Sequence, residues 1–142
     1  MLEMAMKLHE KSVRTVDEAQ RPTILLVEDT DDNRFMMSRL LELSGYSVIE
    51  AVNGQEAIQI AEEQRPQLIL MDLSLPLIDG LAATREIRNL PELSKVPIIV
   101  VSAHDTAEFH NEALAAGCDA YITKPIDFAE LETLISRILS SE

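Results

Sequence analysis

The chain has 142 residues, 46% of them hydrophobic, and its 12 basic and 25 acidic residues give a net charge of −13. That charge argues against binding to nucleic acid or to anionic membrane, because both attract clustered Lys and Arg, and the single cysteine, Cys118, excludes an internal disulfide framework. Its aliphatic runs are too short to span a membrane and its first ten residues make a poor signal peptide, so we expect one soluble, cytoplasmic domain.

The first 21 residues stand apart from the rest of the chain. They hold four basic and four acidic residues, so the whole net charge falls on residues 22–142. A heptad-like stripe runs through these residues, but it covers only two heptads, which is too few to establish a coiled coil. We therefore expect an N-terminal extension that is either a frayed tail or a helix that docks on a partner or supports a weak dimer. Its heptad-like stripe consists of Leu2, Met6, His9, Val13 and Val16.

Five short aliphatic or β-branched runs follow, each bounded by polar or turn residues. Such runs are typical of parallel strands that are buried on both faces. The second run alternates more between apolar and polar residues, which suits a strand at the edge of the sheet. The runs are residues 23–27, 46–52, 67–71, 97–101 and 120–123.

Helical patterns alternate with these runs. Asn53 is a suitable N-cap for the second helix, and Gly45 and Gly117 follow the ends of the first and fourth. Five strands that alternate with five helices predict an α/β fold, a doubly wound five-stranded parallel sheet. The expected strand order is 2-1-3-4-5. The helical stretches are residues 31–44, 54–64, 80–89, 105–116 and 127–140.

Polar side chains follow four of the five strands, at the edge where such sheets bind ligands. Glu28 and Asp29 follow the first strand and Asp72 follows the third. Ser102 and Lys124 follow the fourth and the fifth. If the first and third strands are neighbours, the three carboxylates converge, and the hydroxyl and the lysine lie on the far side.

Three carboxylates that converge repel one another, and Mg²⁺ relieves that repulsion because it prefers oxygen ligands. Lys124 would add a fixed positive charge and Ser102 a hydroxyl donor. Metal, lysine and hydroxyl around one carboxylate suit an aspartyl phosphate, with Asp72 as the nucleophile. The residues therefore indicate phosphoryl transfer.

Four segments of the chain carry a resemblance to a known family. Over residues 22–140 the chain resembles the receiver domain of two-component response regulators, in particular stand-alone, chemotaxis-regulator-like ones. The resemblance implies a flavodoxin-like receiver domain over residues 22–142, preceded by the extension of residues 1–21. The segments are ILLVEDTDDNR (24–34), LILMDLSLPLIDG (68–80), IIVVSA (98–103) and AYITKP (120–125).

The resemblance implies a role for each acidic residue of the site. Asp72 corresponds to the phosphoacceptor and Asp29 to a direct Mg²⁺ ligand. Glu28 would act mainly through water, a role that tolerates Glu where the family often has Asp. The backbone carbonyl of Ser74 would be a further ligand, and Lys124 would hold the phosphoryl group.

The resemblance also implies a conformational switch. Ser102, which stands where Thr is a common alternative, would move to hydrogen-bond the phosphoryl group. Tyr121 would swing inward into the space that Ser102 leaves. Pro125 would follow a cis peptide bond that places Lys124.

These roles describe a signalling module that takes a phosphoryl group from a phosphohistidine of a sensor histidine kinase or a histidine phosphotransfer protein. The chain ends at Glu142, so we expect the output to be a change in binding to a downstream effector protein, read out near the fourth helix and the fifth strand. We expect no enzymatic turnover beyond self-phosphorylation and loss of the chain's own phosphoryl group.

Three alternatives remain at this point. An aspartyl phosphohydrolase would usually carry a second Asp where Ser74 stands. A flavodoxin-like cofactor carrier would have a loop rich in Ser, Thr and Gly in place of EDTDD (28–32), which repels a phosphate unless a metal intervenes. A degenerate receiver would lack key residues, whereas all of them are present here.

Overall fold

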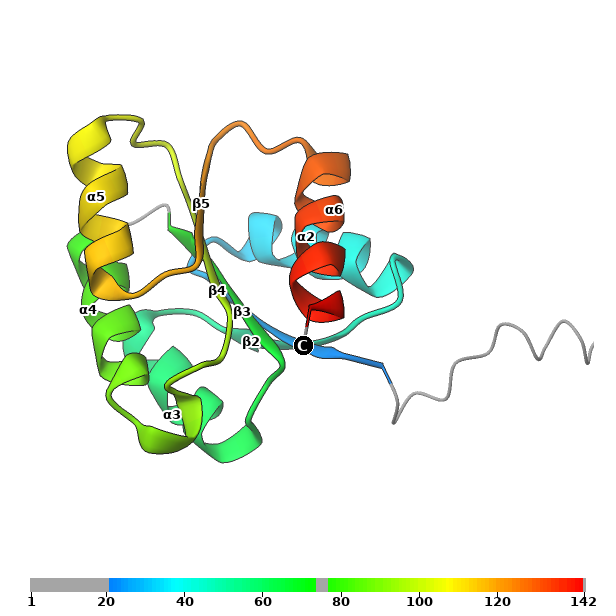
Figure 1. The fold of residues 1–142 in the computed structure, drawn as a ribbon. Helices are drawn as coiled ribbons and strands as arrows, with labels where there is room; N and C mark the ends of the chain where they lie inside the picture. The colour runs from blue at the N-terminus through cyan, green and yellow to red at the C-terminus, as the bar shows by residue number, and fades with distance from the viewer. Residues whose placement is uncertain (1–20, 74–76, 142) are drawn as a thin grey trace, which may run out of the picture.

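The computed structural model describes residues 21–73 and 77–141. Its five strands form one parallel sheet in the order β2-β1-β3-β4-β5, with helices on both faces (Figure 1). The predicted fold class and strand order are confirmed, and β2 lies at an edge, as its alternating pattern indicated. The strands are β1 (Thr23–Glu28), β2 (Ser47–Ala51), β3 (Leu68–Leu73), β4 (Ile98–Ser102) and β5 (Ala120–Thr123).

Side-chain caps set the starts of three helices. The side chains of Asn53, Thr106 and Asp127 each accept a hydrogen bond from a backbone N–H in the first turn of the helix that follows. Because Thr106 is the cap, the fourth helix begins two residues later than the sequence predicted. The helices are α2 (Asp31–Leu43), α3 (Gly54–Gln64), α4 (Leu77–Arg88), α5 (Ala107–Ala116) and α6 (Phe128–Ser140), with a short 3-10 helix η2 (Pro91–Leu93) before β4.

Two hydrophobic cores lie on opposite faces of the sheet. Successive residues of the central strands alternate between them, so that Leu25 packs in one core while Ile24 and Leu26 pack in the other. Helices α3, α4 and α5 cover the first face and α2 and α6 cover the second (Figure 1). Burial on both faces explains why the strands read as continuous apolar runs.

Except for Arg21, the extension predicted over residues 1–21 lies outside the described residues. Within the described part of the chain, no helix is both long and apolar enough to cross a membrane.

Candidate functional site

The register of the sheet brings the predicted site residues to one edge. Glu28 at the end of β1 lies opposite Asp72 on β3, and Ser102 on β4 lies beside the last residue of β3. The backbone N–H of Lys124 donates to the carbonyl of Ser102 at 2.8 Å, which places the lysine directly beyond β5. Four strand ends thus carry the acidic, hydroxyl and basic groups to the carboxyl edge that the sequence predicted.

Asp72 and Lys124 form the closest charged pair of this edge. Lys124 Nζ lies 2.9 Å from Asp72 Oδ1, and Asp72 is only 5% exposed. The two groups form an ion pair. The Lys124–Pro125 peptide bond is cis. The buried carboxylate therefore has a fixed positive charge beside it.

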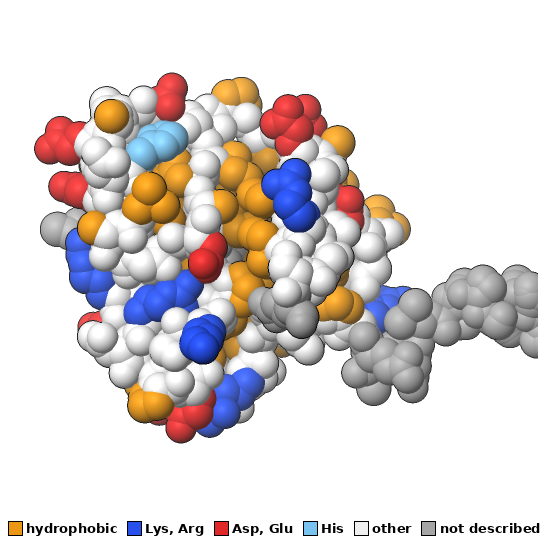
Figure 2. Space-filling model, in the orientation of Figure 1, with side chains coloured by type: hydrophobic (Ala, Val, Ile, Leu, Met, Phe, Trp, Pro, Cys, Tyr) orange, Lys and Arg blue, Asp and Glu red, His pale blue; other side chains and the backbone are white. Residues whose placement is uncertain are grey.

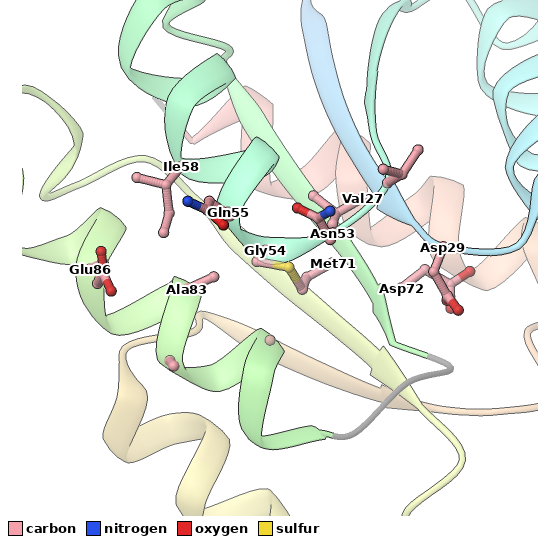
Figure 3. A pocket seen from close by; sticks show the side chains of 13 residues that line it. Val27, Asp29, Asn53, Gly54, Gln55, Ile58, Met71, Asp72, Ala83 and Glu86 are labelled. Atoms are coloured by element: carbon pink, nitrogen blue, oxygen red, sulfur yellow. The ribbon is translucent and has the colours of Figure 1, made fainter.

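Asp72 reaches two cavities, one on each side of the sheet edge. The larger, of about 450 Å³, lies between α3 and α4 and is lined by Asp29 as well as Asp72. Figure 3 shows these two carboxylates close together at one end of the cavity. The smaller, of about 300 Å³, is lined by Lys124, Asn33 and Phe128 among others. A small molecule or a partner's side chain thus has room to approach Asp72.

Glu28 is fully buried beside these groups. Burial raises the pKa of its carboxyl to about 7, and the neighbouring Asp72 adds to the rise. The backbone N–H of Thr30, which donates to Glu28 Oε2 at 2.8 Å, and the charge of Lys124 both oppose it. Glu28 is therefore a carboxylate held inward by its own loop.

The donor set suits a hydrated Mg²⁺ ion. Asp29 and Asp72 offer carboxylate oxygens at one cavity, and Mg²⁺ commonly binds through one or two carboxylates and keeps several waters. Among the described residues, no group of three or more His, Cys, Asp or Glu side chains is arranged to hold a metal by itself. Ser74, the further ligand that the resemblance implies, lies outside the described residues.

Ser102 and Tyr121 are joined through the backbone of His104. Ser102 is 1% exposed, and its Oγ accepts from the N–H of His104 at 3.2 Å. The hydroxyl of Tyr121 donates to the carbonyl of the same residue at 2.7 Å. The Tyr121 ring also lies 4.1 Å from the ring of His110. The β4–α5 loop therefore links the two residues for which a switch was predicted.

Two connections at this edge of the sheet do not follow from the sequence. His104 acts here through its backbone, so its residue type carries no signal of the role. Arg34 joins the end of β1 to β2, and the only sequence signal for this contact is an acidic residue, Asp31, three positions earlier on the same helix.

Comparisons with known proteins agree with the observed fold. The family model of the response regulator receiver domain matches residues 24–136. A polar-differentiation response regulator DivK of Brucella anthropi is 39% identical over 115 residues, which cover 80% of this chain and 94% of the relative.

Solved structures of receiver domains share the fold. The receiver domain of a Pseudomonas aeruginosa sensor histidine kinase, solved with a magnesium ion coordinated in its active site cleft, is 38% identical with a TM-score of 0.77, covering 84% of this chain and 98% of that one. The chemotaxis protein CheY4 of Vibrio cholerae is 26% identical with a TM-score of 0.76, covering 82% and 98%. The chain therefore belongs to the receiver domain family of two-component response regulators.

Proposed function

We propose that this receiver domain accepts a phosphoryl group on Asp72 from a phosphohistidine donor, with Mg²⁺, and thereby changes the surface it offers to a partner protein. One observation carries the proposal. The buried Asp72 carboxylate has Lys124 Nζ 2.9 Å from one oxygen and shares a cavity with Asp29. A nucleophile, a fixed cation and a second carboxylate for a metal are the components that phosphoryl transfer to an aspartate needs.

The transfer forms one bond and breaks another. A carboxylate oxygen of Asp72 attacks phosphorus, the P–N bond of the phosphohistidine breaks, and its electron pair stays on the departing imidazole nitrogen. The ammonium group of Lys124 then faces the negative oxygens of the phosphoryl group. The product is an acyl phosphate on Asp72.

Asp29 and Asp72 would hold the magnesium ion, with Glu28 acting through water and the carbonyl of Ser74 as a further ligand. When bound, Mg²⁺ would neutralise charge on the phosphoryl oxygens. The related Pseudomonas aeruginosa receiver domain, solved with magnesium in its active site cleft, supports magnesium as the metal.

Ser102 and Tyr121 would report the phosphoryl group to the surface. If Ser102 Oγ turns toward the phosphoryl group, it gives up its bond with the N–H of His104, and the loop that Tyr121 also holds is free to rearrange. Two arrangements of one loop, biased by a new group at the site, are sufficient for a switch.

The readout surface in this proposal is the face between α5 and α6. Figure 2 shows hydrophobic side chains gathered along the middle of this face. Half-buried residues of β5 and of the loop after it contribute to the face, among them Tyr121, Ile122 and Ile126. A surface of this kind suits a protein partner, so the output would be a downstream effector. The phosphodonor would be a sensor histidine kinase or a histidine phosphotransfer protein in the cytoplasm.

The chain's own chemistry would then be limited to self-phosphorylation and slow loss of its phosphoryl group. The test is to incubate the protein with Mg²⁺ and acetyl phosphate and to measure its intact mass. We expect the mass of one phosphoryl group to be added, and to be removed by hydroxylamine, which cleaves acyl phosphates.

Two variants make this test specific. Asp72→Asn should add no phosphoryl group, whereas Asp32→Asn, which removes an exposed carboxylate in the first turn of α2, should be modified like the wild type. No modification of the wild type in the presence of Mg²⁺, or equal modification of Asp72→Asn, would contradict the proposal.

A further inference from the structure

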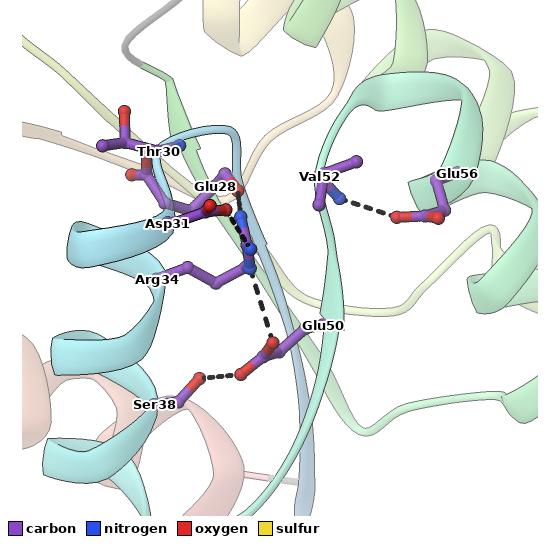
Figure 4. A network of polar contacts seen from close by, with 8 residues as sticks. All are labelled: Glu28, Thr30, Asp31, Arg34, Ser38, Glu50, Val52 and Glu56. Atoms are coloured by element: carbon purple, nitrogen blue, oxygen red, sulfur yellow. Dashed lines mark hydrogen bonds and ion pairs between the residues drawn. The ribbon is translucent and has the colours of Figure 1, made fainter.

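Arg34 connects three elements around the loop that carries Asp29 (Figure 4). Its Nη1 donates to the backbone carbonyl of Glu28 at 2.9 Å, and its Nη2 donates to Asp31 Oδ1 at 2.6 Å. Its Nε lies 3.4 Å from Glu50 Oε1. These partners lie at the end of β1, in the first turn of α2 and on β2. With 15% of its side chain exposed, the guanidinium is fixed in place between them.

Glu50 is held from a second side. The hydroxyl of Ser38, which is buried on α2, donates to Glu50 Oε2 at 2.7 Å. The carboxylate therefore bridges Ser38 and Arg34. A guanidinium is a rigid planar fork, so a carboxylate on one edge helps to set the direction of its other N–H groups.

The bond to Glu28 bears directly on Asp29. The carbonyl of Glu28 and the N–H of Asp29 belong to one planar peptide group. A donor that binds this carbonyl therefore fixes the orientation of the peptide group between Glu28 and Asp29. The N–H of Thr30 holds the side chain of Glu28 at the same time, so the loop is held through both a backbone and a side-chain group.

We propose that Arg34 is a positioning residue for the magnesium site. Through the Glu28 carbonyl it holds Asp29 in the orientation that binds Mg²⁺, while Glu50 and Ser38 hold the guanidinium. The inference rests on the proposed function, because it takes Asp29 to be a metal ligand. Residues that orient metal ligands without touching the metal typically change metal affinity by about 10- to 100-fold when they are replaced.

The positive charge of Arg34, taken alone, predicts the opposite change in Mg²⁺ affinity when the arginine is removed. Arg34 and Mg²⁺ are both positive, so removal of the arginine charge would strengthen Mg²⁺ binding if charge were its only contribution. A loss of affinity in Arg34→Ala therefore reports positioning and not charge.

The chain offers a matched control on the same helix. Arg39 also lies on α2, but its side chain is 61% exposed and its closest acidic partner, Glu42, is 4.0 Å away. Arg39→Ala removes the same charge as Arg34→Ala without disturbing the loop. Arg34→Lys keeps the positive charge but loses the planar guanidinium, and Arg39→Lys is its control.

The experiment is a Mg²⁺ titration of the full chain, followed by amide chemical shifts in NMR spectra. We expect Arg34→Ala to bind Mg²⁺ about tenfold more weakly than the wild type and Arg39→Ala to match the wild type. Arg34→Lys and Glu50→Gln should fall between them. If the two residues act as one network, Glu50→Gln should add little to the loss already caused by Arg34→Ala. The spectra also show whether each variant is folded. If Arg34→Ala is not folded, the comparison of Arg34→Lys with Arg39→Lys takes its place.

Two results would overturn the inference in distinguishable ways. If the wild type binds Mg²⁺ and Arg34→Ala binds it as tightly as Arg39→Ala or more tightly, the inference fails and the proposed function stands. If the wild type binds no Mg²⁺, the proposed function fails and the inference fails with it.

Discussion

Glu28 and Asp72 are buried carboxylates at neighbouring positions of adjacent strands. Each taken alone would cost free energy to ionise away from water, and together they repel. Different groups offset the cost of burying these two carboxylates. Asp72 has the ammonium of Lys124 at 2.9 Å, whereas Glu28 accepts the N–H of Thr30. The cost is less fully offset at Glu28, and burial raises the pKa of this carboxyl to about 7.

The raised pKa of Glu28 predicts how stability depends on pH without metal. Between its ordinary pKa near 4.5 and the folded value of about 7, the folded protein holds a proton that the unfolded chain releases. The contribution of Glu28 to stability is therefore complete below about pH 4.5 and is lost as the pH rises through 7. Relative to Glu28→Gln, the unfolding free energy of the wild type should fall by about 3 kcal/mol across this range.

Urea denaturation in the presence of EDTA measures this difference. Glu42→Gln, which alters an exposed glutamate on α2, controls for the loss of one acidic side chain and should show no such fall. A wild-type stability that rises with pH relative to Glu28→Gln would contradict the raised pKa.

At this scale the sequence predicted which residues meet and missed how they are held. Glu28, Asp29 and Asp72 could be placed together because strand ends in a parallel sheet share an edge. The bond from Thr30 to Glu28 and the bond from Arg34 to the Glu28 carbonyl depend on side-chain directions within one loop. Periodicity and spacing do not encode such directions.

At the scale of elements, Arg88 ties the end of α4 to the segments on both sides of β4. Its Nε donates to the carbonyl of Gly117 at 2.8 Å, and its Nη1 donates to the carbonyl of Leu93 at 3.2 Å. Its Nη2 donates to Asp119 Oδ2, also at 2.8 Å. The side chain of Arg88 therefore lies directly against the glycine that ends α5.

The two glycines that follow helix ends make a matched pair for testing this contact. Gly45 has φ +101° and Gly117 has φ +111°, so alanine is strained at both. A Cβ at Gly45 would meet nothing within 4 Å, whereas a Cβ at Gly117 would lie 2.7 Å from Cγ of Arg88. We expect Gly45→Ala to cost about 1 kcal/mol and Gly117→Ala to cost at least 1 kcal/mol more, since Arg88 must also move.

Urea denaturation of the two variants, with unchanged m-values, provides the comparison. Equal losses of stability would show that Arg88 yields to the new methyl group without cost. Losses that differ as expected would identify the Arg88 contacts as a part of the fold that resists displacement.

The boundaries of the elements show where sequence reasoning reaches its limit. The predicted strand of residues 67–71 ends before Asp72, because a polar residue breaks an apolar run, yet β3 pairs with β1 through Asp72 and with β4 through Leu73. Backbone hydrogen bonds do not depend on side-chain polarity. The helix expected from residue 80 begins at Leu77 instead, with Gly80 inside it. There the buried Thr84 hydroxyl donates to the Gly80 carbonyl at 2.9 Å.

For the whole molecule, the sequence predicted the architecture more fully than the site. Each central strand is apolar on both sides, and only a sheet covered on both faces by helices buries such strands. The links between distant elements, such as Arg34 to β2 and Tyr121 to the β4–α5 loop, follow from the packed structure. The residues that they join follow no regular spacing in the chain, so no sequence pattern marks these contacts.

The net charge of −13 makes it necessary to distinguish specific Mg²⁺ binding from general screening. Any salt should stabilise so acidic a chain by reducing its self-repulsion. A bound ion adds a further term that depends on its own affinity, and at ten times the dissociation constant this term is about 1.4 kcal/mol. At equal ionic strength, Mg²⁺ should therefore raise the melting temperature of the wild type above its value in NaCl, by roughly 3 to 6 °C.

Two variants identify the source of that difference. Asp29→Asn removes a proposed ligand and should melt at the same temperature in both salts, whereas Asp32→Asn removes an exposed charge of the same region and should keep the wild-type difference. Thermal melts followed by circular dichroism suffice for the measurement. If Asp29→Asn gained as much from Mg²⁺ as the wild type does, the ion would be acting on the whole acidic surface and not at the carboxyl edge of the sheet.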